Sequence, residues 1–141
     1  MSEQQASKKL TLLNAVEIGT KKDLYSHVLF DEEVIYEFNA PRDVFVVTNK
    51  KVILIDADMR KPTQHKLIDK RNNTGLSGKK KEVLIIPFSK ITAFSTETAG
   101  TFDFDLEVKI WASGIGFVEL SFSKGTKNFR ELTIHLAKYI K

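Results

Sequence analysis

The stretch Phe102-Asp103-Phe104-Asp105-Leu106-Glu107-Val108-Lys109-Ile110-Trp111 alternates apolar and charged side chains up to its final tryptophan. Its even-numbered positions are all apolar, and its odd-numbered positions from Asp103 to Lys109 are all charged. Because successive side chains of a strand point to opposite faces, this period of two predicts a long antiparallel strand with one face in a core. Each inward side chain would stabilise the fold by at most roughly 1.5–3 kcal/mol through burial.

Six shorter stretches with strand character flank this one. Residues 34–38 and 117–123 alternate, whereas 44–47 and 52–55 are apolar at every position. A strand that is apolar on both sides has both faces buried, so we expect the sheet to be covered on each side there. The predicted strands are 34–38, 44–47, 52–55, 81–86, 91–96, 102–111 and 117–123.

A helix is predicted at the C-terminal end of the sequence. Phe129, Leu132, Leu136 and Ile140 follow one another at intervals that place them on one helical face. Thr126 is the expected N-cap, because its hydroxyl could accept a free backbone N–H of the first turn. A helix that is apolar on one side only should lie across the sheet or close its open end.

The N-terminal third carries weaker helical signals. Residues 10–18 predict a short helix and residues 21–30 a second one, with Thr20 as its N-cap. We therefore expect a helical extension over 1–33 and a domain over 34–141. Within that domain, residues 57–78 form a long insertion that is rich in basic residues and poor in large apolar ones.

Composition narrows the class of protein. The chain has 141 residues, enough for one domain with a core of its own. It contains no cysteine, which excludes disulfides, thiolate metal sites and cysteine nucleophiles and favours an intracellular location. Residues 1–5 lack the basic and apolar regions of a signal peptide, and no apolar run is long enough to span a membrane. We expect a cytoplasmic protein.

Seven strands followed by one amphipathic helix is the element order of a pleckstrin-homology (PH) barrel. Several segments of the sequence resemble the bacterial PH domain family in the family's own order, and together they cover most of residues 34–141. These segments are RDVFVVTNKK (42–51) with LID (54–56), IPFSKIT (86–92), ETAGTFD (97–103), LEVKIW (106–111) and SKGT (123–126).

The resemblance implies a mainly β fold, a seven-stranded antiparallel bent barrel capped by the C-terminal α-helix, with the N-terminal helical segment added to it. It also implies assembly, because members of this family form closed homo-oligomeric rings, typically pentamers. No activity is established for the family, so the resemblance supplies no catalytic residues, cofactor or metal. The long insertion at 57–78 departs from the family, which usually joins these strands by a short loop.

The outward face of the central strand offers candidate binding residues. Its three carboxylates, at 103, 105 and 107, stand at steps of roughly 6.6–6.8 Å, which would suit a water-flanking carboxylate pair or a hard cation. The alternative is a solvated or partner-facing strand. Trp111 and Phe117 extend the row and either cover the N-terminal helix or anchor a subunit interface. The candidates for an oligomer interface are Asp103, Asp105, Glu107, Lys109, Trp111 and Phe117.

A second candidate surface is basic. Residues 57–81 contain eight Lys or Arg against two Asp, a surplus of six that exceeds the net charge of +4 of the whole chain. Such a segment can attract the phosphates of an anionic membrane surface, or it can simply keep a loop solvated. It has no aromatic residue for base stacking, so nucleic acid is an unlikely partner. The anion-binding candidates are Arg60, Lys61, Lys66, Lys70, Arg71, Lys79, Lys80 and Lys81.

Enzymatic signals are weak. His27, His65 and His135 share no metal-ligand spacing, and no serine lies in a nucleophile-elbow context. The leading hypothesis is a non-enzymatic, ring-forming PH-like domain that scaffolds or binds a protein partner. Peripheral binding to anionic lipid or phosphate through residues 60–81 is the alternative, and an enzyme with a carboxylate or metal site is third.

Overall fold

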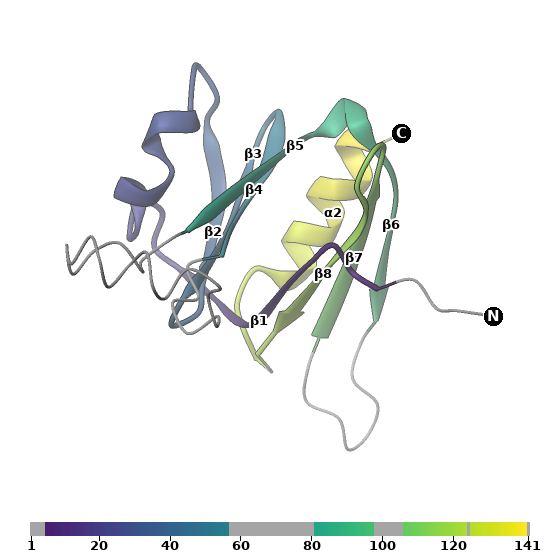
Figure 1. Ribbon diagram of the computed structural model, residues 1–141. Coiled ribbons are helices and arrows are strands. Elements are labelled where there is room, and N and C mark those ends of the chain that lie inside the picture. Colours follow the sequence, from purple (N-terminus) through teal and green to yellow (C-terminus); the bar gives the residue numbers. More distant parts are fainter. Residues whose placement is uncertain (1–4, 57–80, 98–105, 124, 141) are drawn as a thin grey trace, which may run out of the picture.

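The computed structural model describes residues 5–56, 81–97, 106–123 and 125–140. Within them, eight strands form one sheet in the order β5-β4-β3-β2-β1-β8-β7-β6, and a C-terminal helix, α2, packs beside it (Figure 1). The elements are β1 (Lys8–Val16), η1 (Lys22–Leu24), η2 (Ser26–Val28), β2 (Val34–Asn39), β3 (Asp43–Thr48), β4 (Lys51–Asp56), β5 (Glu82–Pro87), η3 (Phe88–Lys90), β6 (Ile91–Glu97), β7 (Leu106–Ala112), β8 (Gly116–Phe122) and α2 (Phe129–Tyr139). This is the mainly β, PH-like architecture with a C-terminal helix that the sequence predicts.

The alternation that defines the central strand is realised in β7. Val108 and Ile110 are fully buried, whereas Glu107, Lys109 and Trp111 point to the opposite face and keep partial exposure. β7 pairs with β6 on one side and with β8 on the other, both antiparallel. The predicted inward and outward positions are therefore confirmed over 106–111, and residues 102–105 lie outside the described part of the chain.

The prediction of seven strands was wrong by one, because most of the helix predicted over residues 10–18 belongs to a strand, β1. β1 pairs in parallel with β8 through its first half and antiparallel with β2 through its last residues, so it joins the two halves of the sheet. Between Leu10 and Leu13 the register shifts, and Leu12 adopts a left-handed backbone with φ 62° while its side chain turns outward. This bulge puts two buried leucines three residues apart, which is the spacing that suggested a helix.

The prediction of a helix over residues 21–30 was also wrong, because this segment holds only the two 3₁₀ turns η1 and η2. Tyr25, between them, has φ −131°, which interrupts helical geometry and turns its ring onto the sheet. Thr20 does not cap a helix, since its hydroxyl donates to the carbonyl of Glu17 at 2.5 Å. No N-terminal helical extension is therefore present in the described residues.

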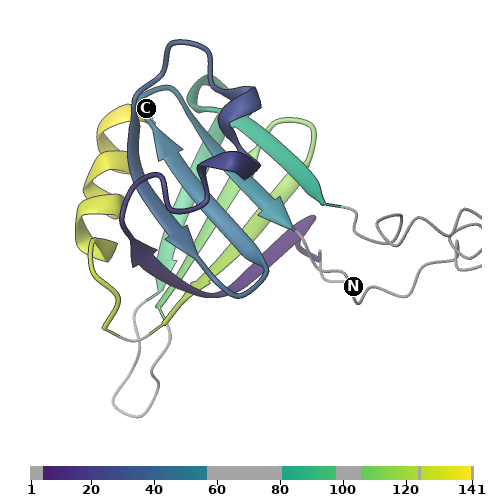
Figure 2. The same cartoon turned by 90° about the vertical axis from the view of Figure 1, so that its left-hand side faces the viewer.

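The sheet has an apolar core on each side, as predicted from strands that are apolar throughout. The larger core lies inside the barrel, between the two halves of the sheet and α2. The smaller one lies outside β3 and β4, where Tyr25 packs with Val44, Val46, Ile53 and Ile55. Figure 2 shows the η1–η2 segment lying over this outer face, with α2 at the side of the barrel.

The C-terminal helix was predicted with the correct buried face. Leu132 and Leu136 are fully buried in the barrel core, and Phe129 and Ile140 pack against it. The predicted cap at Thr126 was wrong, because the N-cap is Asn128 in a left-handed conformation. The Thr126 hydroxyl instead accepts the backbone N–H of Ala15 at 2.7 Å, which ties the connection before α2 to the end of β1.

Candidate functional site

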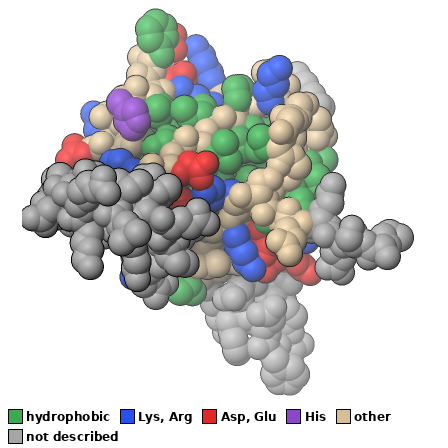
Figure 3. All heavy atoms as spheres, viewed as in Figure 1, with side chains coloured by type: hydrophobic (Ala, Val, Ile, Leu, Met, Phe, Trp, Pro, Cys, Tyr) green, Lys and Arg blue, Asp and Glu red, His purple; other side chains and the backbone are tan. Residues whose placement is uncertain are grey.

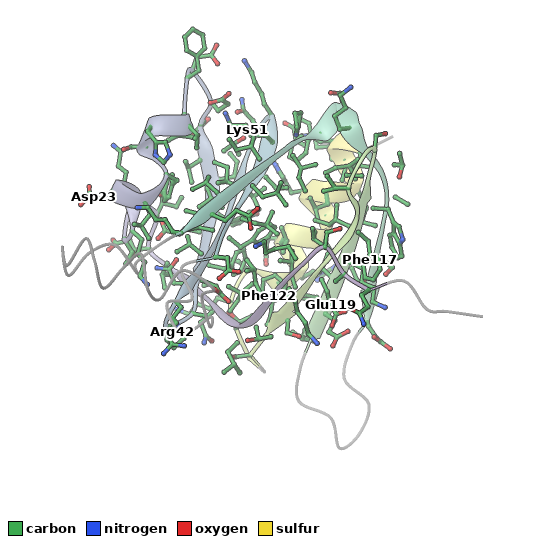
Figure 4. The ribbon with its side chains drawn as sticks, in the orientation of Figure 1. Asp23, Arg42, Lys51, Phe117, Glu119 and Phe122 are labelled. Carbon is green, nitrogen blue, oxygen red and sulfur yellow. The ribbon has the colours of Figure 1, made fainter. Side chains whose placement is uncertain are left out.

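The outward side chains of β6, β7 and β8, together with the start of β1, form one continuous surface, the outer β6–β8 face. Cross-strand pairing arranges the side chains of this face in three rows. Figure 4 shows two of them, Phe117 and Glu119 of β8, in the right-hand half of the view. The first row is Glu97, Glu107 and Ser121, the second is Ser95, Lys109, Glu119 and Lys9, and the third is Ala93, Trp111 and Phe117.

The third row is aromatic. The rings of Trp111 and Phe117 lie 5.7 Å apart between centroids at an interplanar angle of 33°, and the Lys109 ammonium lies 5.6 Å from the Phe117 centroid. Phe117 is thereby reduced to 9% exposure, whereas Trp111 remains partly exposed. The N-terminal helix, one of the two surfaces that these rings could have covered, is not present in the described residues. Ser7, just before β1, donates its N–H to the Phe117 carbonyl at 2.8 Å.

The first two rows carry an imbalance of charge. Burial raises the pKa of Glu107 above its ordinary value, and the nearby carboxylates of Glu119 and Glu97 raise it further, while Lys109 opposes them. Lys9 reaches Glu119 at 3.6 Å. A cavity of about 300 Å³ opens between these rows, lined by Ser95, Thr96, Glu97, Glu107 and Lys109. A cation placed there would relieve the repulsion that Glu107 experiences.

The interface candidates from the sequence are thus brought together where they are described. Glu107, Lys109, Trp111 and Phe117 share the outer β6–β8 face, and Asp103 and Asp105 lie outside the described residues. Among described residues, no group of three or more His, Asp or Glu side chains has the geometry of a metal site. The surface combines an aromatic row with charged rows beside it, a composition that is also found at protein interfaces.

Glu37 is a buried carboxylate that the sequence reasoning missed. It is 1% exposed and accepts the backbone N–H groups of Gly19 and Lys21, each at 2.8 Å. The Tyr25 hydroxyl also donates to it, at 2.7 Å. Burial and this carboxylate raise the pKa of Tyr25, so the hydroxyl remains a donor. Because β2 alternates there, its pattern predicts that Glu37 is an ordinary outward residue. The only sequence signal that this face is covered is the neighbouring strand β3, which is apolar on both sides.

Lys8 is a second buried charge that was missed. Its ammonium pairs with Asp56 at 3.2 Å and with Glu82, and its side chain is 8% exposed. Burial lowers the pKa of Lys8, but the two carboxylates outweigh it and leave the pKa raised. Asp56 is the last residue of β4 and Glu82 the first of β5, so Lys8 fixes both ends of the basic insertion to β1.

Comparison with known proteins identifies the family to which this fold belongs. A family model described as bacterial PH domain matches residues 6–140. The chain belongs to the bacterial PH domain family. A protein with a PH domain from Shewanella loihica PV-4 superposes with a TM-score of 0.68 at 29% identity, over 93% of this chain and 99% of the other. A PH domain from Shewanella amazonensis SB2B gives 0.60 at 33% identity, over 89% and 90%.

A match to a curated protein covers a smaller part of both chains. An uncharacterised protein of Bacillus subtilis, YjqA, is 40% identical over 90 residues, which are 63% of this chain and 59% of that protein. These relatives of the bacterial PH domain are PH-domain or uncharacterised proteins, so they carry no catalytic assignment to this chain.

The basic candidates of this bacterial PH domain are mostly outside the described residues. The structure does not describe Arg60, Lys61, Lys66, Lys70, Arg71, Lys79 and Lys80, and Lys81 is exposed just before β5. A hollow of about 440 Å³ lies near this end of the barrel, between β1 and the β2–β3 turn. Its lining mixes bases and acids, among them Lys9, Arg42 and Asp43.

The histidines are dispersed in this PH domain. His135 of α2 lies 3.1 Å from the Thr48 carbonyl through Nε2 and packs edge-on against Tyr36. His27 is exposed on η2, and His65 lies outside the described residues. In the described part of the chain, no helix is both long enough and apolar enough to cross a membrane.

Proposed function

We propose that this bacterial PH domain is a non-enzymatic assembly module that forms a closed homo-oligomeric ring, a pentamer, and that the ring scaffolds or binds a protein partner. The observation that carries the proposal is the aromatic row of the outer β6–β8 face. Trp111 is partly exposed there, beside a carboxylate, Glu107, whose charge is poorly balanced within one copy. A cytoplasmic location is part of the same proposal.

The chemistry of this face suits contact with another copy better than catalysis. Trp is among the residues most enriched at interface hot spots, and a neighbouring base could compensate Glu107. A contact between two different surfaces of identical chains propagates head to tail and closes into a ring when the rotation fits. The Trp111–Phe117 pair would form the apolar centre of that contact, and the charged rows its rim.

Amine-reactive cross-linking tests the closed ring directly. Treated protein separated on a denaturing gel should give a ladder of bands that stops at the pentamer, because a closed ring has no free contact for another copy. Protein unfolded before treatment is the control and should give monomer. A ladder that continues without end would indicate an open filament, and a single monomer band would contradict assembly.

The alternative function, binding to anionic membranes, rests on the surplus of basic residues in 57–81. Sedimentation with phosphatidylserine-containing vesicles compares the parent with a variant carrying Lys79→Gln, Lys80→Gln and Lys81→Gln. A ring that binds protein and not lipid should not sediment with the vesicles, so both proteins should stay in the supernatant. Binding of the parent that the variant loses, and that weakens as salt rises and exposed charges are screened over about 10 Å, would favour the alternative.

A further inference from the structure

The loop between η2 and β2 displays an unusually exposed aromatic side chain. Phe30 is 90% exposed, more than any other large hydrophobic side chain in the described residues. The loop stands away from the sheet at one end of the molecule (Figures 1 and 2), and Figure 3 shows hydrophobic side-chain atoms protruding at that end. A phenyl ring left in water gains nothing from folding of the single chain. A single exposed hydrophobic side chain is common on protein surfaces, and Phe30 becomes a candidate anchor only through the contacts that hold its loop.

The backbone of this loop is held in place by a buried ion pair. Glu32 accepts the N–H of Phe30 at 2.7 Å and pairs with Lys51 at 3.1 Å, and both charged side chains are mostly buried. The Lys51 ammonium also donates to the Val28 carbonyl at 2.5 Å. The Phe30 N–H and Lys51 lower the pKa of Glu32 below its ordinary value, so Glu32 stays ionised as the acceptor.

A second set of contacts joins the loop to the β3–β4 turn. Asn49 accepts the Glu33 N–H through Oδ1 at 3.1 Å and returns its own N–H to the Glu33 carbonyl at 3.2 Å. Lys50 pairs with Asp31 at 3.0 Å. These contacts hold the loop in one conformation with Phe30 exposed. An interface residue that is already in position loses little conformational entropy when it binds.

The surface that fits this loop is the outer β6–β8 face of another copy. Its third row is aromatic, with Trp111 partly exposed. In Figure 4, Phe117 of that row lies on the opposite side of the molecule from Asp23, which belongs to the η1–η2 segment. Two patches on different sides of one chain can meet only between copies, and such a contact is heterologous.

Charge favours the same pairing. Residues 31–33 of the loop are three acids, and the facing turn supplies two bases, Lys50 and Lys51, which leaves the loop with a net charge of −1. The row next to the aromatics has two bases, Lys9 and Lys109, and one acid, Glu119, which gives +1. The apolar tip and its charged surroundings are thus complementary to the aromatic row and to the basic row beside it, whereas the acids Glu97 and Glu107 lie one row further from the aromatic centre of the contact.

We propose that Phe30 of one copy packs against Trp111 of the next copy and is the second half of the ring contact. This inference rests on the proposed function, since it supplies the partner surface for the outer β6–β8 face. Each copy would contribute its Phe30 to one neighbour and receive Phe30 of the other neighbour against its own Trp111.

The single tryptophan of the chain makes a direct assay possible. Phe30→Ser removes the tip and keeps Trp111, whereas Trp111→Ala keeps the tip and contains no tryptophan. Each variant alone should lose the ring. The Trp111→Ala variant still has its Phe30 tip, and this tip can dock on Trp111 of the Phe30→Ser variant. Titrating it into Phe30→Ser should therefore shift the Trp111 emission to shorter wavelength, with saturation at equal amounts.

Two controls make the result specific. The Trp111→Ala chain that also carries Phe30→Ser should produce no shift, and Ile134→Ser, which removes another exposed hydrophobic side chain, should assemble as the parent does. If the parent forms a ring and Phe30→Ser forms the same ring, or if the titration gives no shift, the Phe30 contact is wrong while the ring stands. If the parent is a monomer, the proposed function fails as well.

Discussion

Replacing Glu37 by alanine is expected to lower the free energy of unfolding by about 3–5 kcal/mol, because three donors lose their acceptor and each buried donor left unsatisfied costs about 1–3 kcal/mol. The carboxylate is 1% exposed and has three donors, the N–H groups of Gly19 and Lys21 and the Tyr25 hydroxyl. Without it these donors lose their acceptor, and the segment that covers the outer core of β3 and β4 loses its attachment.

Urea unfolding followed by circular dichroism measures this loss, and two milder variants calibrate it. Tyr25→Phe keeps the ring in its apolar site and removes one hydrogen bond, so it should cost about 1 kcal/mol. Glu37→Gln keeps the shape but loses the charge, and should fall between the two. A loss below about 1 kcal/mol for Glu37→Ala, no larger than one ordinary hydrogen bond, would show that the network is not what holds the segment.

The positions of the strands from β2 onward could be predicted from the sequence, because alternation and short apolar runs are local patterns. In β7 the alternation of Glu107, Val108, Lys109 and Ile110 determines which side chains enter the core, whatever the neighbouring strands are. The same argument applied to α2, where Leu132 and Leu136 share one face. Sequence segments that resemble the family added the order in which these elements pack.

The N-terminal strand could not be predicted by the same reasoning. The bulge at Leu12 inserts one residue between Leu10 and Leu13, and a periodicity argument assumes that no residue is inserted. The pairing of β1 with β8 also joins residues more than 100 positions apart, which no local pattern reports.

The candidate site was predicted in part for a related reason. Trp111 and Phe117 were expected on one face because both belong to a single hairpin, and the structure pairs them directly. Phe30 carried no signal, since a phenylalanine among apolar residues at 28–30 reads as part of a buried stripe. Its exposure follows from Glu32 and Lys51, whose contact depends on how the η2–β2 loop and β4 meet in space.

The second large effect is expected on assembly. Trp111→Ala should remove a hot spot worth about 2 kcal/mol or more per contact, which weakens each contact by about thirtyfold. The fold should persist, because Trp111 is on the outer face and its contact with Phe117 adds only about 1 kcal/mol beyond the area it buries. Circular dichroism should therefore match that of the parent, while the ring dissociates into smaller species at micromolar concentration.

Thr92→Ala is a matched control for that variant. Thr92 is exposed on β6 beside the same row, and its hydroxyl only donates to the Trp111 carbonyl at 3.3 Å. The control should assemble as the parent does. A Trp111→Ala protein that keeps the full ring would leave assembly intact but place its interface elsewhere on the molecule.

The molar mass of the parent protein in solution shows whether the chain forms a pentamer. Light scattering coupled to size-exclusion chromatography, repeated over a range of micromolar loading concentrations, reports that mass without reference to shape. A closed pentamer should give a single peak at five times the mass of the 16.0 kDa chain, with no larger species as concentration rises. A peak at 16.0 kDa throughout the range would contradict it.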